Sequence, residues 1–158
     1  MDIPMSSLTP GNKISLLSAT SWDRYLRHAS FAGFVTGYTA DPTFLKDATF
    51  LLTPANNGNG AYVSFQSVNY PGQFLRHSGF RIYLNGGSDP VFRQDSSFKI
   101  MPSLNGDPSM VSFQSANFPT HYLAVNRENP SEVWITTVNQ SSLWDKQRAS
   151  WRVKTPLA

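Results

Sequence analysis

Short runs in which apolar and polar residues alternate, separated by turn-forming residues, make up most of this chain. Val63–Ser67 alternates in this way, and similar runs follow at Gln73–His77, Phe80–Leu84 and Phe98–Met101. Alternation with a period of two is typical of β-strands, and the Asn-Gly and Pro-Gly pairs between the runs favour tight turns. No segment shows a convincing period of 3.6 residues. We therefore predict an all-β protein.

The pattern recurs three times along the chain. Ser15–His28, Ser64–His77 and Ser112–Val125 align without gaps, and their starts are 49 and 48 residues apart. Each copy closes on an aromatic residue at a matched position, namely Phe50, Phe98 and Trp151. Internal repeats of this length indicate one structural unit used repeatedly. The predicted repeats cover about residues 14–61, 62–109 and 110–154.

Three repeats of about 48 residues, each with four short strands, give roughly twelve strands. A propeller usually needs at least four blades to close around its channel, which disfavours that architecture. Three copies suit a β-trefoil, so we predict a single β-trefoil domain over residues 1–158. The apolar positions shared by all repeats are the predicted core, namely Leu26, Leu75, Leu123, Phe50, Phe98 and Trp151.

Composition narrows the possible functions. The 158 residues include no cysteine, which excludes disulfides, a thiol nucleophile and cysteine-bound metals. The net charge is only +3 and the basic residues are scattered, which argues against a nucleic-acid partner. No apolar run approaches the ~18 residues of a membrane span, and no signal peptide is visible. We expect a cytoplasmic protein if the chain is complete and a secreted one if it is an excised module.

Two of the three histidines occupy the same position in their repeats. His28 is followed by Asp47, and His77 by Asp95, at matched positions some twenty residues further on. The third repeat has neither residue. Because the two residue types occur together twice and are absent together once, we expect the fold to bring each His–Asp pair together.

Such a pair has two interpretations. It is either a structural hydrogen bond between a strand and the end of its repeat, or part of a polar pocket. A carboxylate beside an imidazole matches the vicinal hydroxyls of a sugar. Two ligands are too few for a metal site, so we expect neither metal nor cofactor. Aromatic residues at matched positions are candidates for the pocket walls, although each suits the core equally well: Tyr25, Phe74, Phe31 and Phe80.

Ser64–His77, together with Phe92–Phe98, resembles the arabinofuranosidase B domain, also called carbohydrate-binding module family 42. The resemblance covers about Lys13–Lys154. It implies a β-trefoil that binds L-arabinofuranose side chains of arabinoxylan or arabinan, one sugar in each pocket. It assigns the pocket residues to His28, Asp47, His77 and Asp95.

The third repeat has Val125 and Arg148 at those positions, so the resemblance does not extend to a third site. In this family the module is commonly attached to a glycoside hydrolase catalytic domain, which is therefore an implied partner. The ligand expected from the resemblance is an arabinofuranosyl-bearing polysaccharide or another glycan.

The duplicated carboxylates favour binding over catalysis. Asp47 and Asp95 come from different repeats, and threefold symmetry would hold them further apart than the ~5–9.5 Å that glycoside hydrolysis requires. No Gly-x-Ser-x-Gly motif is present. We therefore predict a non-catalytic lectin-like module. The alternative is a β-trefoil that binds a protein or an anionic glycan through the third repeat or through a basic face formed by Arg24, Arg27, Arg76, Arg81 and Arg93.

Overall fold

The computed structural model describes residues 7–158, and this part of the chain contains twelve strands and three short α-helices. The strands are β1 (Lys13–Ser18), β2 (Arg24–Ala29), β3 (Ala32–Gly37), β4 (Phe50–Pro54), β5 (Val63–Ser67), β6 (Phe74–Ser78), β7 (Arg81–Asn85), β8 (Phe98–Pro102), β9 (Met110–Ser115), β10 (Tyr122–Val125), β11 (Val133–Thr136) and β12 (Trp151–Lys154). The helices are α1 (Pro42–Asp47), α2 (Pro90–Asp95) and α3 (Leu143–Arg148).

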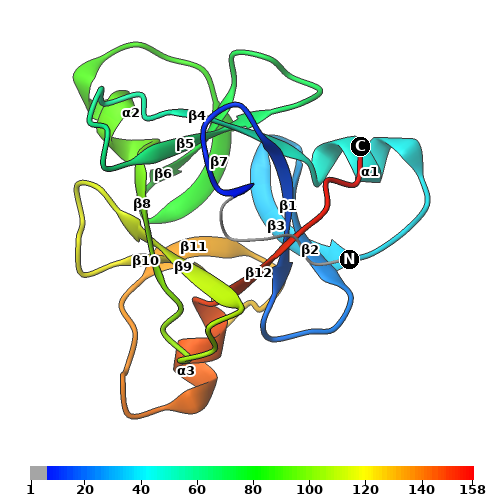
Figure 1. Ribbon diagram of the computed structural model, residues 1–158, viewed down its shortest axis with the longest axis vertical. Coiled ribbons are helices and arrows are strands. Elements are labelled where there is room, and N and C mark those ends of the chain that lie inside the picture. The colour runs from blue at the N-terminus through cyan, green and yellow to red at the C-terminus, as the bar shows by residue number, and fades with distance from the viewer. Residues whose placement is uncertain (1–6) are drawn as a thin grey trace.

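The first and last strands of each repeat form a closed antiparallel barrel. Around the ring, β1 pairs with β12, β12 with β9, β9 with β8, β8 with β5, β5 with β4, and β4 again with β1. Figure 1 shows these strands around the centre of the molecule. Closure removes the exposed sheet edges that an open sheet of this size would present.

The two middle strands of each repeat form a hairpin, and the three hairpins cap one end of the barrel. The hairpins are β2–β3, β6–β7 and β10–β11. They meet through β3–β7 and β11–β7 pairing, and a bridge between Phe34 and Glu132 joins the first hairpin to the third. This arrangement is a β-trefoil, which confirms the predicted all-β fold and its roughly twelve strands.

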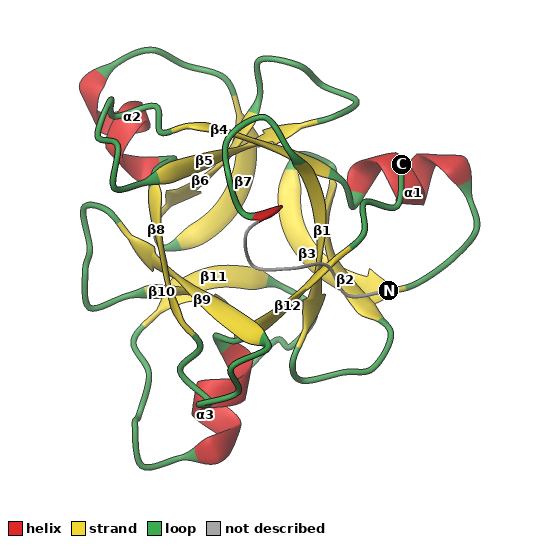
Figure 2. Ribbon diagram, in the orientation of Figure 1, coloured by secondary structure: helices red, strands yellow, loops and turns green. Residues whose placement is uncertain are grey.

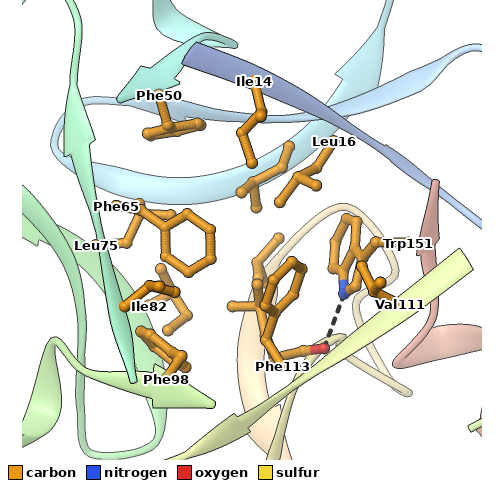
Figure 3. Packing of buried hydrophobic residues seen from close by; sticks show 14 of the residues in the cluster. Ile14, Leu16, Phe50, Phe65, Leu75, Ile82, Phe98, Val111, Phe113 and Trp151 are labelled. Carbon is orange, nitrogen blue, oxygen red and sulfur yellow. Dashed lines mark hydrogen bonds between the residues drawn. The ribbon is translucent and has the colours of Figure 1, made fainter. Parts of the chain in front are cut away.

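The core lies where barrel and cap meet. All six residues predicted from the repeats are fully buried there. Around them, Phe65 packs against Phe113 and Phe98, with ring centroids 5.1 and 5.6 Å apart (Figure 3). The indole Nε1 of Trp151 donates to the Leu123 carbonyl oxygen at 3.0 Å, which satisfies its polar atom inside the core.

Periodicity did not predict the three helices, because six residues are too few to show a 3.6-residue stripe. Each helix lies outside the barrel at a different corner of the molecule (Figure 2). The local signals are those of helix starts: Pro42 and Pro90 occupy the first helical turn, and the Asp89 side chain accepts a hydrogen bond from the Phe92 N–H. The last helical residue of α1 and α2 is a buried aspartate. No helix in residues 7–158 is long and apolar enough to cross a membrane.

The helix of the third repeat ends differently, on a buried arginine. Arg148 has no solvent exposure, and its guanidinium donates to Asp145 at 3.0 Å and to the Val125 carbonyl oxygen. Asp145 also accepts two hydrogen bonds from Arg127, at 2.9 and 2.6 Å. The hydrogen bonds from Arg127 and Arg148 hold the pKa of Asp145 well below its usual range, despite burial. A buried ion pair therefore closes this repeat.

We predict that Arg148→Met lowers the free energy of unfolding by about 3–5 kcal/mol, because it removes one partner from a buried, hydrogen-bonded ion pair. Urea unfolding followed by tryptophan fluorescence would measure the change. Arg127→Met is the matched control: this side chain is 42% exposed, so its loss should cost no more than about 1 kcal/mol. Equal losses for the two variants would contradict the assignment of Arg148 as the critical partner.

Candidate carbohydrate-binding pockets

The first two repeats each carry a small surface pocket built around the predicted His–Asp pair. His28 Nε2 lies 3.6 Å from Asp47 Oδ1, and His77 Nε2 lies 3.5 Å from Asp95 Oδ1. The histidines come from β2 and β6, whereas the aspartates end α1 and α2. All four residues are buried. The two pockets that they line have volumes of about 130 and 230 Å³.

An asparagine from the following repeat joins each pair. In the first pocket Asn69 Oδ1 lies 3.0 Å from His28 Nε2, and Asn69 Nδ2 donates to Asp47 Oδ1 at 2.8 Å. Asn117 makes the same bonds in the second pocket, at 2.8 Å to His77 and 2.9 Å to Asp95. Because the amide oxygen can only accept, the facing Nε2 atom of each histidine carries the proton.

A second partner holds each aspartate from the other side. Arg27 Nη2 donates to Asp47 Oδ2 at 2.6 Å, and Arg76 Nη2 donates to Asp95 Oδ2 at 2.7 Å. The guanidinium of Arg27 also lies over the Phe44 ring, 5.4 Å from its centroid. These contacts do not use all the lone pairs of the two carboxylates, so each carboxylate retains acceptor capacity toward its pocket.

Burial lowers the pKa of His28 below 6.5, although the nearby Asp47 carboxylate opposes that shift. The imidazole is therefore neutral at pH 7. Ser67 Oγ lies 3.2 Å from the same Nε2 atom that faces Asp47. A nucleophilic Ser–His–Asp arrangement needs serine and aspartate at opposite ring nitrogens, so this geometry differs from a catalytic triad.

Aromatic rings from two repeats form the pocket walls. Phe31 and Tyr70 meet edge to face at 5.4 Å in the first pocket, and Phe80 and Phe118 meet at 5.3 Å in the second. These four rings are 39 to 46% exposed. In the second pocket His121 stacks on Phe80 at 5.1 Å, which extends the apolar wall.

Phe31 and Phe80 occupy backbone conformations that large side chains avoid. Their φ angles are +61° and +69°, and the preceding Ser30 and Gly79 are also positive, as in a type I′ hairpin turn. Each phenylalanine costs about 1–2 kcal/mol there relative to a relaxed conformation. The Phe31 carbonyl accepts from the Leu84 N–H at 2.9 Å, so the neighbouring cap hairpin holds the turn in place. Strain of this kind at an exposed aromatic ring is characteristic of functional sites.

Two of the predicted wall residues need correction. Tyr25 is buried against Leu17, Phe44 and Ala48, and Phe74 packs on Phe92, so neither lines a pocket. Each of the two residues lies three positions before the pocket histidine of its strand. Their side chains therefore project from the opposite face of β2 and β6. Tyr70 and Phe118, which do line the pockets, were missed because they belong to the next repeat.

The third repeat lacks the His–Asp pair. Val125 and Arg148 occupy the histidine and aspartate positions, and Arg148 donates to the Val125 carbonyl. The guanidinium therefore lies where the other repeats hold their polar pair. Within residues 7–158, no cluster of three or more potential metal ligands occurs.

Three of the five arginines of the predicted basic face are in ion pairs. Arg27 and Arg76 bind the pocket aspartates, and Arg81 lies 3.3 Å from Glu132. Arg81 also lies over the rings of Phe34 and Tyr83. These contacts reduce the charge that Arg27, Arg76 and Arg81 offer to a partner.

Comparison with solved structures finds the same fold in several proteins. An arabinofuranosidase complexed with arabinofuranosyl-α-1,2-xylobiose matches 95% of this chain with a TM-score of 0.83 and 24% identity, and the match covers 32% of that protein. The designed threefold symmetric protein ThreeFoil matches 90% of this chain and 98% of its own, with a TM-score of 0.65 and 12% identity. These likenesses establish the β-trefoil fold.

Sequence comparison identifies the family. A probable alpha-L-arabinofuranosidase B from Aspergillus clavatus is 37% identical over 83 residues, which are 51% of this chain and 16% of that protein. The chain thus corresponds to a small part of these much longer relatives. The model of the alpha-L-arabinofuranosidase B (ABFB) domain matches residues 55–153, well over half of the chain. The chain therefore belongs to the alpha-L-arabinofuranosidase B (ABFB) domain family.

Proposed function

We propose that this chain is a non-catalytic carbohydrate-binding module that holds L-arabinofuranose side chains of arabinoxylan, arabinan or a related glycan. The binding residues are His28 and Asp47 in one pocket and His77 and Asp95 in the other. The observation that carries the proposal is the duplicated His–Asn–Asp network beneath two exposed aromatic walls. Membership of the ABFB family supports the choice of sugar.

The size and chemistry of the pockets suit a single small sugar. Volumes of about 130 and 230 Å³ lie below the ~300–1,000 Å³ of pockets for drug-sized ligands. Asp47 and Asp95 accept hydrogen bonds from sugar hydroxyls, and the aromatic rings pack against the apolar C–H face. An arabinofuranosyl branch enters such a pocket from the side, with the polymer backbone remaining outside.

Weak binding at each pocket explains why two are useful. A pentose has about ten non-hydrogen atoms, and at roughly 0.3–0.5 kcal/mol per atom one pocket binds it in the millimolar range. Two pockets on neighbouring branches of one polymer raise the apparent affinity ~10²-fold when their spacings match. Asp47 and Asp95 lie in separate pockets, which also argues against their use as one hydrolytic pair.

In the solved arabinofuranosidase the match covers about a third of that protein. We propose that this module directs an attached or associated glycoside hydrolase domain toward its polysaccharide. The alternative function, binding of a protein or an anionic glycan through the basic face, is weakened by the ion pairs of Arg27, Arg76 and Arg81.

We predict that Asp47→Asn and Asp95→Asn each lower retention on arabinoxylan about tenfold, and that the double variant lowers it about a hundredfold. Each change removes the charged acceptor of one pocket with little change of shape. Affinity electrophoresis in gels containing arabinoxylan would measure retention. Asp89→Asn is the matched control, because it removes the same charge from the other end of α2 and asparagine still caps the helix. A folded double variant with unchanged retention would contradict the pocket assignment.

We also predict that Phe31→Asn and Phe80→Asn weaken binding of methyl α-L-arabinofuranoside about tenfold in the pocket concerned without lowering stability by more than about 1 kcal/mol. Asparagine tolerates positive φ, so the turn remains while the aromatic wall is lost. Calorimetric titration and thermal unfolding would measure the two effects. Tyr38→Asn, at a 52% exposed ring outside both pockets, should leave binding unchanged. If the phenylalanine variants bind as the unmodified chain does, the rings do not contact the sugar.

A further inference from the structure

The loop between β1 and β2 is attached to the barrel differently from its two counterparts. In the second repeat Gln66 Oε1 accepts from the Gly72 N–H at 2.8 Å, and in the third Gln114 Nε2 donates to the Pro119 carbonyl at 2.7 Å. Leu17 occupies the corresponding position in the first repeat. Its side chain packs with Tyr25 and cannot make this bond. The first repeat therefore lacks the side chain that lies beneath the loop in the other two.

An open cleft of about 610 Å³ lies at this place. Its floor is a row of side chains across three neighbouring strands, because Met110 on β9 pairs with Arg152 on β12, which pairs with Leu17 on β1. Residues directly opposite in paired strands project from the same face of a sheet. The hydroxyl-bearing loop residues Thr20 and Ser21 form one wall.

Trp22 lies at the rim of this cleft with 87% of its surface exposed. The corresponding residues of the other repeats are prolines, Pro71 and Pro119. A tryptophan that buries almost none of its large apolar surface contributes little to folding. The ring is available to pack against the C–H face of a ligand.

Two cations line the same cleft. Arg152 and Lys154 are separated by one residue on β12, so both project from one face with their Cα atoms about 7 Å apart. Ser109 Oγ, at 3.0 Å, and Asp107, at 3.8 Å, hold the Arg152 guanidinium at the edge of the cleft. Both side chains already have partners within the protein, and their remaining N–H groups can still donate to a single carboxylate between them.

We propose that this cleft binds a uronic acid unit of an acidic polysaccharide. Trp22 packs on the pyranose ring, Arg152 and Lys154 pair with its carboxylate, and the loop hydroxyls bond to the sugar hydroxyls. The volume of the cleft accommodates a disaccharide or longer segment, unlike the two small pockets. A protein or membrane partner would require a wider apolar surface than Trp22, Leu17 and Met110 provide among the hydroxyls and charges of this cleft. The site shares no lining residue with either His–Asp pocket, so it does not depend on the function proposed above.

Calorimetric titration of the full chain with polygalacturonate and with its methyl ester tests the proposal, because esterification removes the carboxylate charge and leaves the pyranose ring and its hydroxyls unchanged. We expect the acid to bind at least tenfold more tightly than the ester, and its affinity to fall with added NaCl. Trp22→Ala and Arg152→Gln should each weaken binding of the acid about tenfold. Lys99→Gln is the matched control, since Lys99 occupies the position of Arg152 in the second repeat and faces Gln114 across the strand pair.

Further measurements separate this site from its alternatives. Trp22→Ala should leave retention on neutral arabinoxylan unchanged, and the Asp47→Asn/Asp95→Asn variant should still bind polygalacturonate, so each proposal can fail alone. Equal binding of acid and ester, or unchanged binding by folded Trp22→Ala, would overturn the uronate site. Tighter binding of heparin or RNA that is lost in the same variants would assign the cleft to polyanions in general and overturn it equally.

Discussion

Buried hydrogen bonds that join each repeat to its neighbour are the constraint on which the rest of this structure depends. Ser64 Oγ accepts from the Asn56 N–H and donates to the Ser96 carbonyl, and Ser112 Oγ joins Leu104 to Ala149 in the same way. These serines are fully buried. Each repeat thus supplies polar groups that its neighbours need, because buried donors and acceptors without partners would be destabilising. The same dependence explains why both pockets are completed by the asparagine of the following repeat.

The strained turns show how the barrel supports a feature that local preference opposes. A phenylalanine at positive φ is unfavourable by itself, yet Phe31 and Phe80 each accept a backbone hydrogen bond from the adjacent cap hairpin, at 2.9 and 2.8 Å. The cap hairpins are held in turn by the shared core. Large aromatic rings consequently stand half exposed above the polar pairs, where relaxed turns would carry glycine or asparagine.

Much of the fold was predictable from the sequence, because each signal was repeated three times. Leu26 and Trp151 are buried as their recurrence indicated. Of each pocket, only the His–Asp pair within one repeat was predictable. The hydrogen-bond network also needs Asn69 and Asn117, which belong to the repeat after the pair that they contact. The sequence did contain a signal for these asparagines. The first repeat has Thr20 at the corresponding position, and the repeat that precedes it around the barrel is the third, which has no His–Asp pair. The helices were missed because they are too short to show a helical period, whereas the burial of Arg148 and the orientation of Tyr25 depend on tertiary contacts that no local pattern contains.

The asparagine bridge has a consequence for how such a protein changes during evolution. A pocket spans the junction of two repeats, with His28 on one side and Asn69 on the other. Duplicating or deleting one repeat therefore replaces a junction, and the new junction forms a pocket of this kind only if both of its halves match. The number of His–Asn–Asp pockets in a chain of this design follows the number of matched junctions, and replacing the His–Asp pair in one repeat removes a single pocket while the barrel still closes, as the third repeat shows.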